Sequence, residues 1–127
     1  MFNLFRTQPV GEAMTAREAY EAMKNGEMIL VDVRTPNEWA KTGVGEGVHP
    51  ISAADPNFLA RLEALTDGDR SKKIGFICAS GARSAQVQQI LMQQGWENVV
   101  NVHDGMMGNR NAPGWIRSGL PVVPWQG

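Results

Sequence analysis

The chain has 127 residues, of which 43% are hydrophobic and 20% charged, and its formal net charge at pH 7 is −1. This length and composition are those of one globular domain and exclude a long disordered protein. The balanced charge excludes a global positive field that would hold a nucleic acid, and the single cysteine excludes an internal disulfide framework or a cysteine-cluster metal site.

Membrane and secretory segments are not expected. The start of the chain, interrupted early by Arg6 and Gln8, lacks the sustained apolar core of a signal peptide. No apolar stretch approaches the roughly 18 residues that cross a bilayer. We therefore expect one soluble, cytoplasmic domain over residues 1–127, with an N-terminal arm over 1–13 and a C-terminal tail over 120–127.

The first part of the chain predicts two helices around a buried strand. Residues 1–13 are typical of an arm or a short edge strand. Thr15 to Glu18 match a capping box, which predicts a helix that ends at Asn25-Gly26. The nearly continuous apolar run over 28–33 predicts a strand covered on both faces, and a short helix is expected over 36–41.

The middle of the chain repeats this alternation. A brief extended piece is expected over 48–52, then a helix with Asp55 as its cap and Pro56 as its first residue. A second buried strand is predicted over 73–77. A helix is predicted over 84–94, with Val87, Ile90 and Leu91 facing inward and the glutamines outward.

The last part predicts a third buried strand and a short helix. The strand covers 99–102, and the helix lies within 113–120. Strands that alternate with helices indicate an α/β fold, a central parallel sheet with helices on both faces. Ligands bind such sheets beyond the carboxyl ends of the strands, so attention falls on the segment after Ile77.

That segment begins with the lone cysteine, Cys78, at a strand end, followed by a loop of small residues that opens a helix. The N–H groups of such a loop, together with the positive end of the helix dipole, stabilise an anion. Both effects favour the Cys78 thiolate. A lone cysteine is more often an inert, buried small hydrophobe, but the small-residue loop and Arg83 favour a reactive one.

We predict Cys78 as the nucleophile of a catalytic site. Arg83 supplies a permanent planar cation suited to oxyanions, and Gly81 can adopt the positive φ of a tight loop. Ser84 is either a donor to the sulfur or simply the N-cap of the helix. The predicted substrate- or anion-binding residues are the six that follow the cysteine: Ala79, Ser80, Gly81, Ala82, Arg83 and Ser84.

Three segments together resemble the single-domain rhodanese-like sulfurtransferases. Cys78–Ser84 is similar to that family's Cys-x-x-Gly-x-Arg-Ser/Thr loop. Val31–Trp39 resembles its Asp-Val-Arg-x-x-x-Glu-aromatic signature, and Trp115–Val122 its closing Trp-x-x-x-Gly-Leu-Pro-Val. The resemblance implies a parallel sheet of about five strands with helices on both faces, and the cysteine loop as the active site.

The resemblance also implies the chemistry. A sulfane sulfur would pass from a donor such as thiosulfate to Cys78 as a persulfide, and from there to a thiophilic acceptor, cyanide or a thiol. The expected partners are thus a small-molecule sulfur donor and acceptor, the acceptor being a small molecule or a protein thiol. No metal or organic cofactor is needed, and both a monomer and a homodimer are compatible with the sequence.

Two segments depart from the family pattern. Gly43–Val48 has Val44 where the family usually has a histidine, which affects local packing more than chemistry. The segment 105–114 is longer than the common spacing, and we predict that it lies beside the cysteine loop and shapes access to Cys78.

Other polar residues are given structural interpretations first. Asp32, Arg34 and Glu38 are expected to form a hydrogen-bond network that holds loops, with substrate contact by Arg34 as the alternative. A Cys–His enzyme would need His49 or His103 near Cys78, although a capped surface loop is the simpler interpretation of His103.

Two other functions use a similar loop or fold. Cysteine-dependent phosphatases have a longer loop than the four residues that Cys78 and Arg83 enclose, and an arsenate reductase would need a resolving cysteine. A non-catalytic binding or sensing module is the remaining alternative. Such relatives generally lose the cysteine, so the sequence favours an enzyme.

Overall fold

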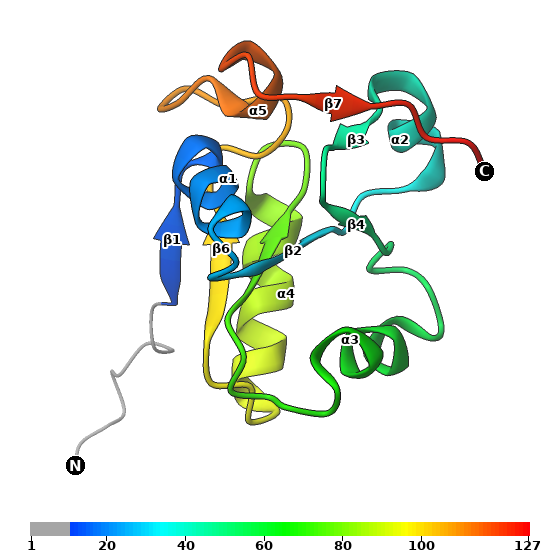
Figure 1. Cartoon of the computed structure of the whole chain (residues 1–127), viewed down its shortest axis with the longest axis vertical. Coiled ribbons are helices and arrows are strands. Elements are labelled where there is room, and N and C mark those ends of the chain that lie inside the picture. The colour runs from blue at the N-terminus through cyan, green and yellow to red at the C-terminus, as the bar shows by residue number, and fades with distance from the viewer. Residues whose placement is uncertain (1–10) are drawn as a thin grey trace.

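The computed structural model of the chain describes residues 11–127 (Figure 1). Its centre is a five-stranded sheet in the order β1-β6-β5-β2-β4, and every neighbouring pair is parallel. The α/β fold predicted from the alternating pattern is therefore confirmed. The strands are β1 (Glu12–Met14), β2 (Ile29–Asp32), β4 (His49–Pro50), β5 (Ile74–Ile77) and β6 (Val99–Val102).

Five helices and a small antiparallel ribbon complete the described part of the chain. The ribbon pairs β3 (Val44–Gly45) with β7 (Val122–Val123). The helices are α1 (Ala16–Lys24), α2 (Pro36–Thr42), α3 (Phe58–Thr66), α4 (Ala82–Gln93) and α5 (Gly114–Arg117). None of the helices among residues 11–127 is long and apolar enough to span a membrane.

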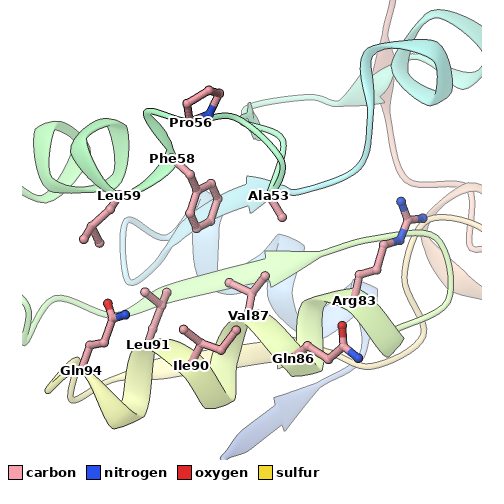
Figure 2. Close-up of a pocket in the computed structure, with 10 residues that line it drawn as sticks. All are labelled: Ala53, Pro56, Phe58, Leu59, Arg83, Gln86, Val87, Ile90, Leu91 and Gln94. Carbon is pink, nitrogen blue, oxygen red and sulfur yellow. The ribbon is translucent and has the colours of Figure 1, made fainter.

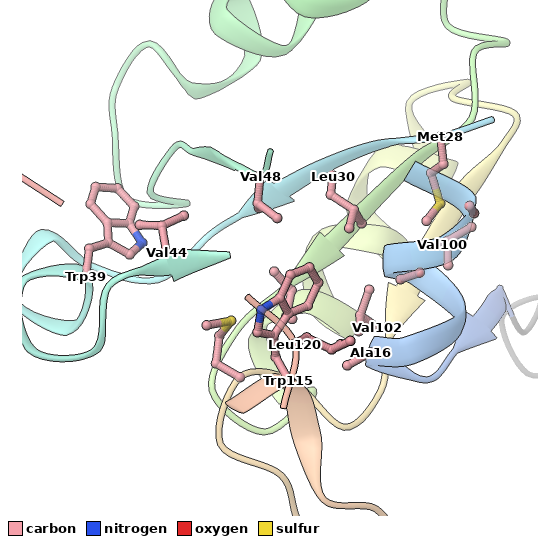
Figure 3. Packing of buried hydrophobic residues seen from close by; sticks show 14 residues of the cluster. Ala16, Met28, Leu30, Trp39, Val44, Val48, Val100, Val102, Trp115 and Leu120 are labelled. Carbon is pink, nitrogen blue, oxygen red and sulfur yellow. The ribbon is translucent and has the colours of Figure 1, made fainter. Parts of the chain in front are cut away.

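Two hydrophobic clusters cover the two faces of the sheet. The first packs α1, α2 and α5 against the sheet, and Trp115 lies in its middle near Leu120 and Val102 (Figure 3). The second packs α3 and α4 against the other face and includes Cys78 and Phe76. This second cluster places the cysteine on the side of the sheet that α3 and α4 cover.

The local signals in the sequence identify the helix starts unevenly. The predicted capping box at Thr15 is present, and Thr35 with Glu38 forms a second box ahead of α2. The predicted start of α3 is wrong, because Asp55 forms a turn instead, and the helix begins at Phe58. The carboxylate of Asp55 pairs with Arg61 rather than capping the helix.

Helix α4 departs from its predicted boundaries and orientation. It begins at Ala82, two residues earlier than expected, and Gly81 rather than Ser84 is its N-cap. Ile90, predicted to face inward, is 53% exposed, whereas Gln88, predicted to face outward, is buried. The Gln88 amide donates hydrogen bonds to the carbonyls of Glu12 and Val99, which explains how a glutamine is accommodated under the sheet edge.

The first described residues add an edge strand to the sheet, and the C-terminal tail packs on the first hydrophobic cluster. Of the predicted arm, residues 1–10 lie outside the described residues, while Glu12–Met14 forms the edge strand β1. In the tail, Val122 and Val123 pair with β3, and the Trp125 ring packs edge-on against Trp39 with centroids 5.3 Å apart. The tail therefore covers the chain's own core.

Candidate active site

The cysteine loop lies where the strand order reverses. From β2 the chain moves outward to β4, and from β5 it moves in the opposite direction to β6. The carboxyl ends of β2 and β5 are adjacent, with Asp32 opposite Ile77. Open parallel sheets bind ligands at such a point because the two departing loops leave a crevice between them.

The sulfur of Cys78 is surrounded by hydrogen-bond donors at the start of α4. Its Sγ accepts hydrogen bonds from the N–H groups of Gly81, at 3.2 Å, and Ser84, at 3.4 Å. The Ser84 hydroxyl lies 3.4 Å from the same sulfur. Because these groups belong to the first turn of α4 and its cap, the positive end of the helix dipole also points at the sulfur.

These donors decide the ionisation of the thiol. The side chain is only 1% exposed, and burial is the largest single influence, raising the pKa of Cys78. The hydrogen bonds from the Ser84 hydroxyl and from the N–H groups of Ser84, Ser80 and Gly81 together outweigh it, so the pKa lies below its usual value. The loop thus favours the thiolate, the form that acts as a nucleophile.

Glycine is required at the turn of this loop. Gly81 has φ of 101°, a conformation that residues with a Cβ rarely adopt. A Cβ at this position would also collide with the carbonyl oxygen of His103. The backbone can direct the Gly81 N–H at the sulfur because no side chain intervenes.

Ser84 connects the cysteine to β6, a contact that sequence reasoning missed. Its hydroxyl lies 2.6 Å from Oδ1 of Asn101 and 3.2 Å from the Gly81 carbonyl oxygen, as well as near the sulfur. A hydroxyl has one hydrogen to donate. Asn101 therefore competes with the sulfur for that hydrogen. The prediction of a buried strand over 99–102 gave no sign of this contact.

Arg83 forms a bidentate ion pair with Glu38, both nitrogen–oxygen distances being 2.8 Å. This hydrogen-bonded pair lowers the pKa of Glu38 to about 2. The pKa of Arg83 is raised mainly by the same hydrogen bond, and the charge of Cys78 adds to that effect. The sequence grouped Glu38 with Asp32 and Arg34, but Glu38 joins α2 to the cysteine loop instead.

Asp32 and Arg34 form a separate, buried pair. Arg34 donates to both carboxylate oxygens of Asp32 and to the Gly43 carbonyl, and both side chains are fully buried. The structural interpretation of these two residues is confirmed, because the Arg34 guanidinium is engaged by Asp32 and by the Gly43 carbonyl.

The long segment 105–114 lies beside the cysteine loop, as predicted. The N–H groups of Met106 and Met107 donate to the carbonyls of Cys78 and Ala79. The Asn109 amide donates to the carbonyl of Ser80, at 3.0 Å, and to that of His103. This segment thus forms one wall of the loop.

Of the remaining predicted site residues, Ser80 contributes its backbone N–H group to the sulfur, and the roles of Ala79 and Ala82 stay predictions. Ser80 and Ala82 are exposed, and Ala79 is partly buried. Within residues 11–127, the hydrogen bonds to the sulfur come from Gly81 and Ser84, with a further contribution from the Ser80 N–H group, and involve neither His49 nor His103. No cluster of metal-ligating side chains occurs in that range either.

Comparison with known proteins places this geometry in a family. The profile of the rhodanese-like domain matches residues 15–112, which include both strand-end loops. The chain belongs to the rhodanese-like domain family. The resemblance inferred from the three sequence segments is therefore confirmed.

Individual relatives agree with this assignment. A sulfurtransferase from Allochromatium vinosum is 33% identical over 80% of this chain and 83% of its own length. The thiosulfate sulfurtransferase GlpE of Glaesserella parasuis is 28% identical over 86% of this chain and 90% of its own length. The crystal structure of Rv0390 from M. tuberculosis superimposes with a TM-score of 0.70 at 30% identity, covering 91% of this chain and 98% of that one. These relatives support a transferase of the rhodanese family.

Proposed function

We propose that this rhodanese-family protein transfers a sulfane sulfur through a persulfide on Cys78. The observation that carries the proposal is the ring of donors around Cys78 Sγ, supplied by Gly81 and Ser84 at the start of α4. A buried thiol has no need of such donors, whereas a thiolate and a persulfide anion both do.

In the first half-reaction the Cys78 thiolate attacks the outer sulfur of thiosulfate, the simplest donor. The new bond joins Cys78 Sγ to that sulfur, and the sulfur–sulfur bond of the donor breaks. Its electron pair leaves with sulfite, so three negative charges are present before and after the step. The N–H groups of the loop are arranged to stabilise the terminal sulfur, on which the negative charge of the persulfide resides.

In the second half-reaction an acceptor removes the terminal sulfur. Cyanide attacks that sulfur, the bond to Cys78 Sγ breaks, and its electron pair regenerates the thiolate as thiocyanate departs. When the acceptor is a thiolate, the same attack converts the acceptor into a new persulfide and regenerates the Cys78 thiolate. Two half-reactions that share a covalent intermediate predict ping-pong kinetics.

The other predicted residues keep supporting roles in this proposal. Arg83 places a positive charge near the reacting sulfur and orients an anionic donor, although Glu38 shares that charge. Ala79, Ser80 and Ala82 leave the loop backbone open to a substrate because their side chains are small. Ser84 donates its N–H group to the thiolate, and its hydroxyl lies 3.4 Å from the same sulfur.

Intact-protein mass after brief exposure to thiosulfate tests the proposal. We expect the wild-type protein to gain one sulfur atom, about 32 Da, and to lose it when cyanide is added. The Cys78→Ser variant should gain nothing, because its alkoxide is not accessible and cannot form a persulfide. Ser80→Ala is a matched control in the same loop and should load normally, since Ser80 contributes its N–H group rather than its hydroxyl.

Two results of this experiment would contradict the proposed function. An adduct that also forms on Cys78→Ser would place the sulfur elsewhere and contradict the role of Cys78. No adduct with thiosulfate or with other sulfane donors would overturn the sulfurtransferase proposal in favour of a docking module.

A further inference from the structure

A groove lies next to the cysteine loop, between α3 and α4, and no step described above uses it. Its volume is about 420 Å³, which falls within the range of small-molecule sites. Figure 2 shows Phe58 on one side, and Val87 and Leu91 on the other, pointing into the space between them. The larger apolar side chains that line it are Pro56, Phe58, Leu59, Val87, Ile90 and Leu91.

The groove shares Arg83 with the candidate active site. Arg83, from the cysteine loop, lines one end of it (Figure 2). Val87 and Leu91, which form its α4 wall, belong to the same packed cluster as Cys78. A molecule that occupies the groove is therefore adjacent to the face of the sheet on which the reactive sulfur lies.

Two large apolar side chains at the rim of the groove are exposed to water, which is unfavourable for apolar surface. Ile90 is 53% exposed and Leu59 is 39% exposed. Isolated exposed apolar residues need no explanation, but these two flank one groove with apolar walls. An apolar occupant would remove both from water.

The charge of the groove also indicates an apolar occupant. Arg83 is the only charged side chain among the described residues that line it, and both terminal nitrogens of its guanidinium are engaged by Glu38. The remaining polar lining consists of uncharged glutamines, Gln86 and Gln94. An extended anionic substrate would thus find no unpaired cation along this surface.

We infer that the groove binds the apolar body of a thiol acceptor while the thiol reaches the persulfide on Cys78. This inference rests on the proposed function and specifies its second half-reaction. The acceptor thiolate attacks the terminal sulfur, the bond to Cys78 Sγ breaks, and the Cys78 thiolate is released together with an organic persulfide.

A chain-length series of acceptors tests the inference. Persulfide-loaded protein is mixed with straight-chain alkanethiols from ethanethiol to hexanethiol, and the loss of one sulfur is followed by mass. These thiols share one acidity, so their intrinsic reactivity stays constant while their length changes. We expect the second-order rate constant to rise by up to about fourfold per methylene, which corresponds to about 0.8 kcal/mol per buried CH₂.

Variants of the rim assign the effect to the groove. Ile90→Ser and Leu59→Ser should flatten the dependence on length and slow hexanethiol by on the order of tenfold, while discharge by cyanide is unchanged. Ile116→Ser is the matched control, because Ile116 is 37% exposed on α5, outside the groove. This variant should retain the wild-type dependence.

The outcomes separate this inference from the proposed function. Loading by thiosulfate and discharge by cyanide, combined with a flat or variant-independent length series, would overturn the inference and leave the proposed function intact. If Cys78 does not load, alkyl methanethiosulfonates of the same lengths give the answer without a persulfide. They form a Cys78 mixed disulfide and release methanesulfinate, and their rates should show the same dependence on length and on Ile90.

Discussion

Arg34 and Arg83 follow neighbouring parallel strands, β2 and β5, and each pairs with a carboxylate. The pair of Arg34 with Asp32 is fully buried and also holds the Gly43 carbonyl. The pair of Arg83 with Glu38 is partly exposed at the mouth of the candidate site. The two loops thus place the same residue type at the same edge of the sheet in different surroundings.

Burial gives the two pairs different tasks. A buried ion has lost its hydration, so it must keep its partner, and the Asp32–Arg34 pair fixes the loop after β2. A partly exposed pair is solvated and screened, so it adds little stability and its charge can respond to a ligand. The comparison suggests that the loop after β2 is a rigid support for the reactive loop after β5.

The largest effect is expected from breaking the buried pair. Arg34→Met leaves the Asp32 carboxylate buried without its cationic partner and should reduce the free energy of unfolding by about 3–5 kcal/mol. Arg83→Met should reduce it by less than about 1 kcal/mol. Urea unfolding of the two variants measures the difference.

A double variant checks the cause of that effect. Asp32→Leu combined with Arg34→Met removes both buried charges and should be more stable than Arg34→Met alone. Equal losses for Arg34→Met and Arg83→Met would show that burial does not separate the two pairs.

The next effect concerns the backbone of the reactive loop. Gly81→Ala should cost more than the roughly 1–2 kcal/mol of a left-handed non-glycine residue, because its Cβ also collides with the His103 carbonyl. Gly26→Ala is the matched control, since Gly26 has φ of 74° but open space around its Cα. Urea unfolding should therefore give Gly81→Ala a clearly lower free energy of unfolding than Gly26→Ala. Equal losses in the two variants would contradict the predicted collision.

A smaller effect is expected on the acidity of Cys78. Hydrogen bonds lower its pKa, and Ser84→Ala removes the hydroxyl that contributes most among them. The pKa should rise, so alkylation by iodoacetamide should slow at neutral pH and recover at high pH, where the thiol is ionised in both proteins. Ser80→Ala retains its N–H group and should leave the pH profile in place. A profile unchanged by Ser84→Ala would remove Ser84 from the activation of the thiol.

The sequence predicted the elements of this fold better than their inward faces. Buried strands were identified by continuous apolar runs, and α1 by its capping box. Ile90 and Gln88 were assigned to the wrong sides of α4, because helical spacing alone does not say that Gln88 will meet free carbonyls on β1 and β6. The groove depends on that exposed Ile90, so the sequence could not have indicated it.

The site shows the same division between local and long-range information. Cys78, Gly81 and Ser84 lie within seven residues of one another, and the loop chemistry was predictable from that spacing. The partners Asn101 and Glu38 come from other elements, and only the packing of β6 and α2 against the loop brings them there. The sequence therefore did not show that Glu38 neutralises the charge of Arg83, and only the structure reveals this pair.

The smallest effect concerns the charge that Glu38 takes from Arg83. Glu38→Gln preserves a capping residue at the start of α2 and releases the positive charge of Arg83. Because a pair of unit charges in water interacts by about 1 kcal/mol at 4 Å, loading by the thiosulfate dianion should accelerate by a few fold. The rate of sulfur gain at low ionic strength measures this acceleration.

Ionic strength distinguishes released charge from altered geometry. If Glu38→Gln acts by charge, its advantage with thiosulfate should shrink as salt is added, because the screening length falls to about 3 Å at 1 M. The uncharged alkyl methanethiosulfonates should react with Cys78 of both proteins at equal rates at any salt concentration. An acceleration that persists at high salt, or that extends to the alkyl methanethiosulfonates, would mean that Glu38 positions the loop instead. Arg83 would then resemble Arg34 in supporting structure, and the contrast between the two pairs would be one of burial alone.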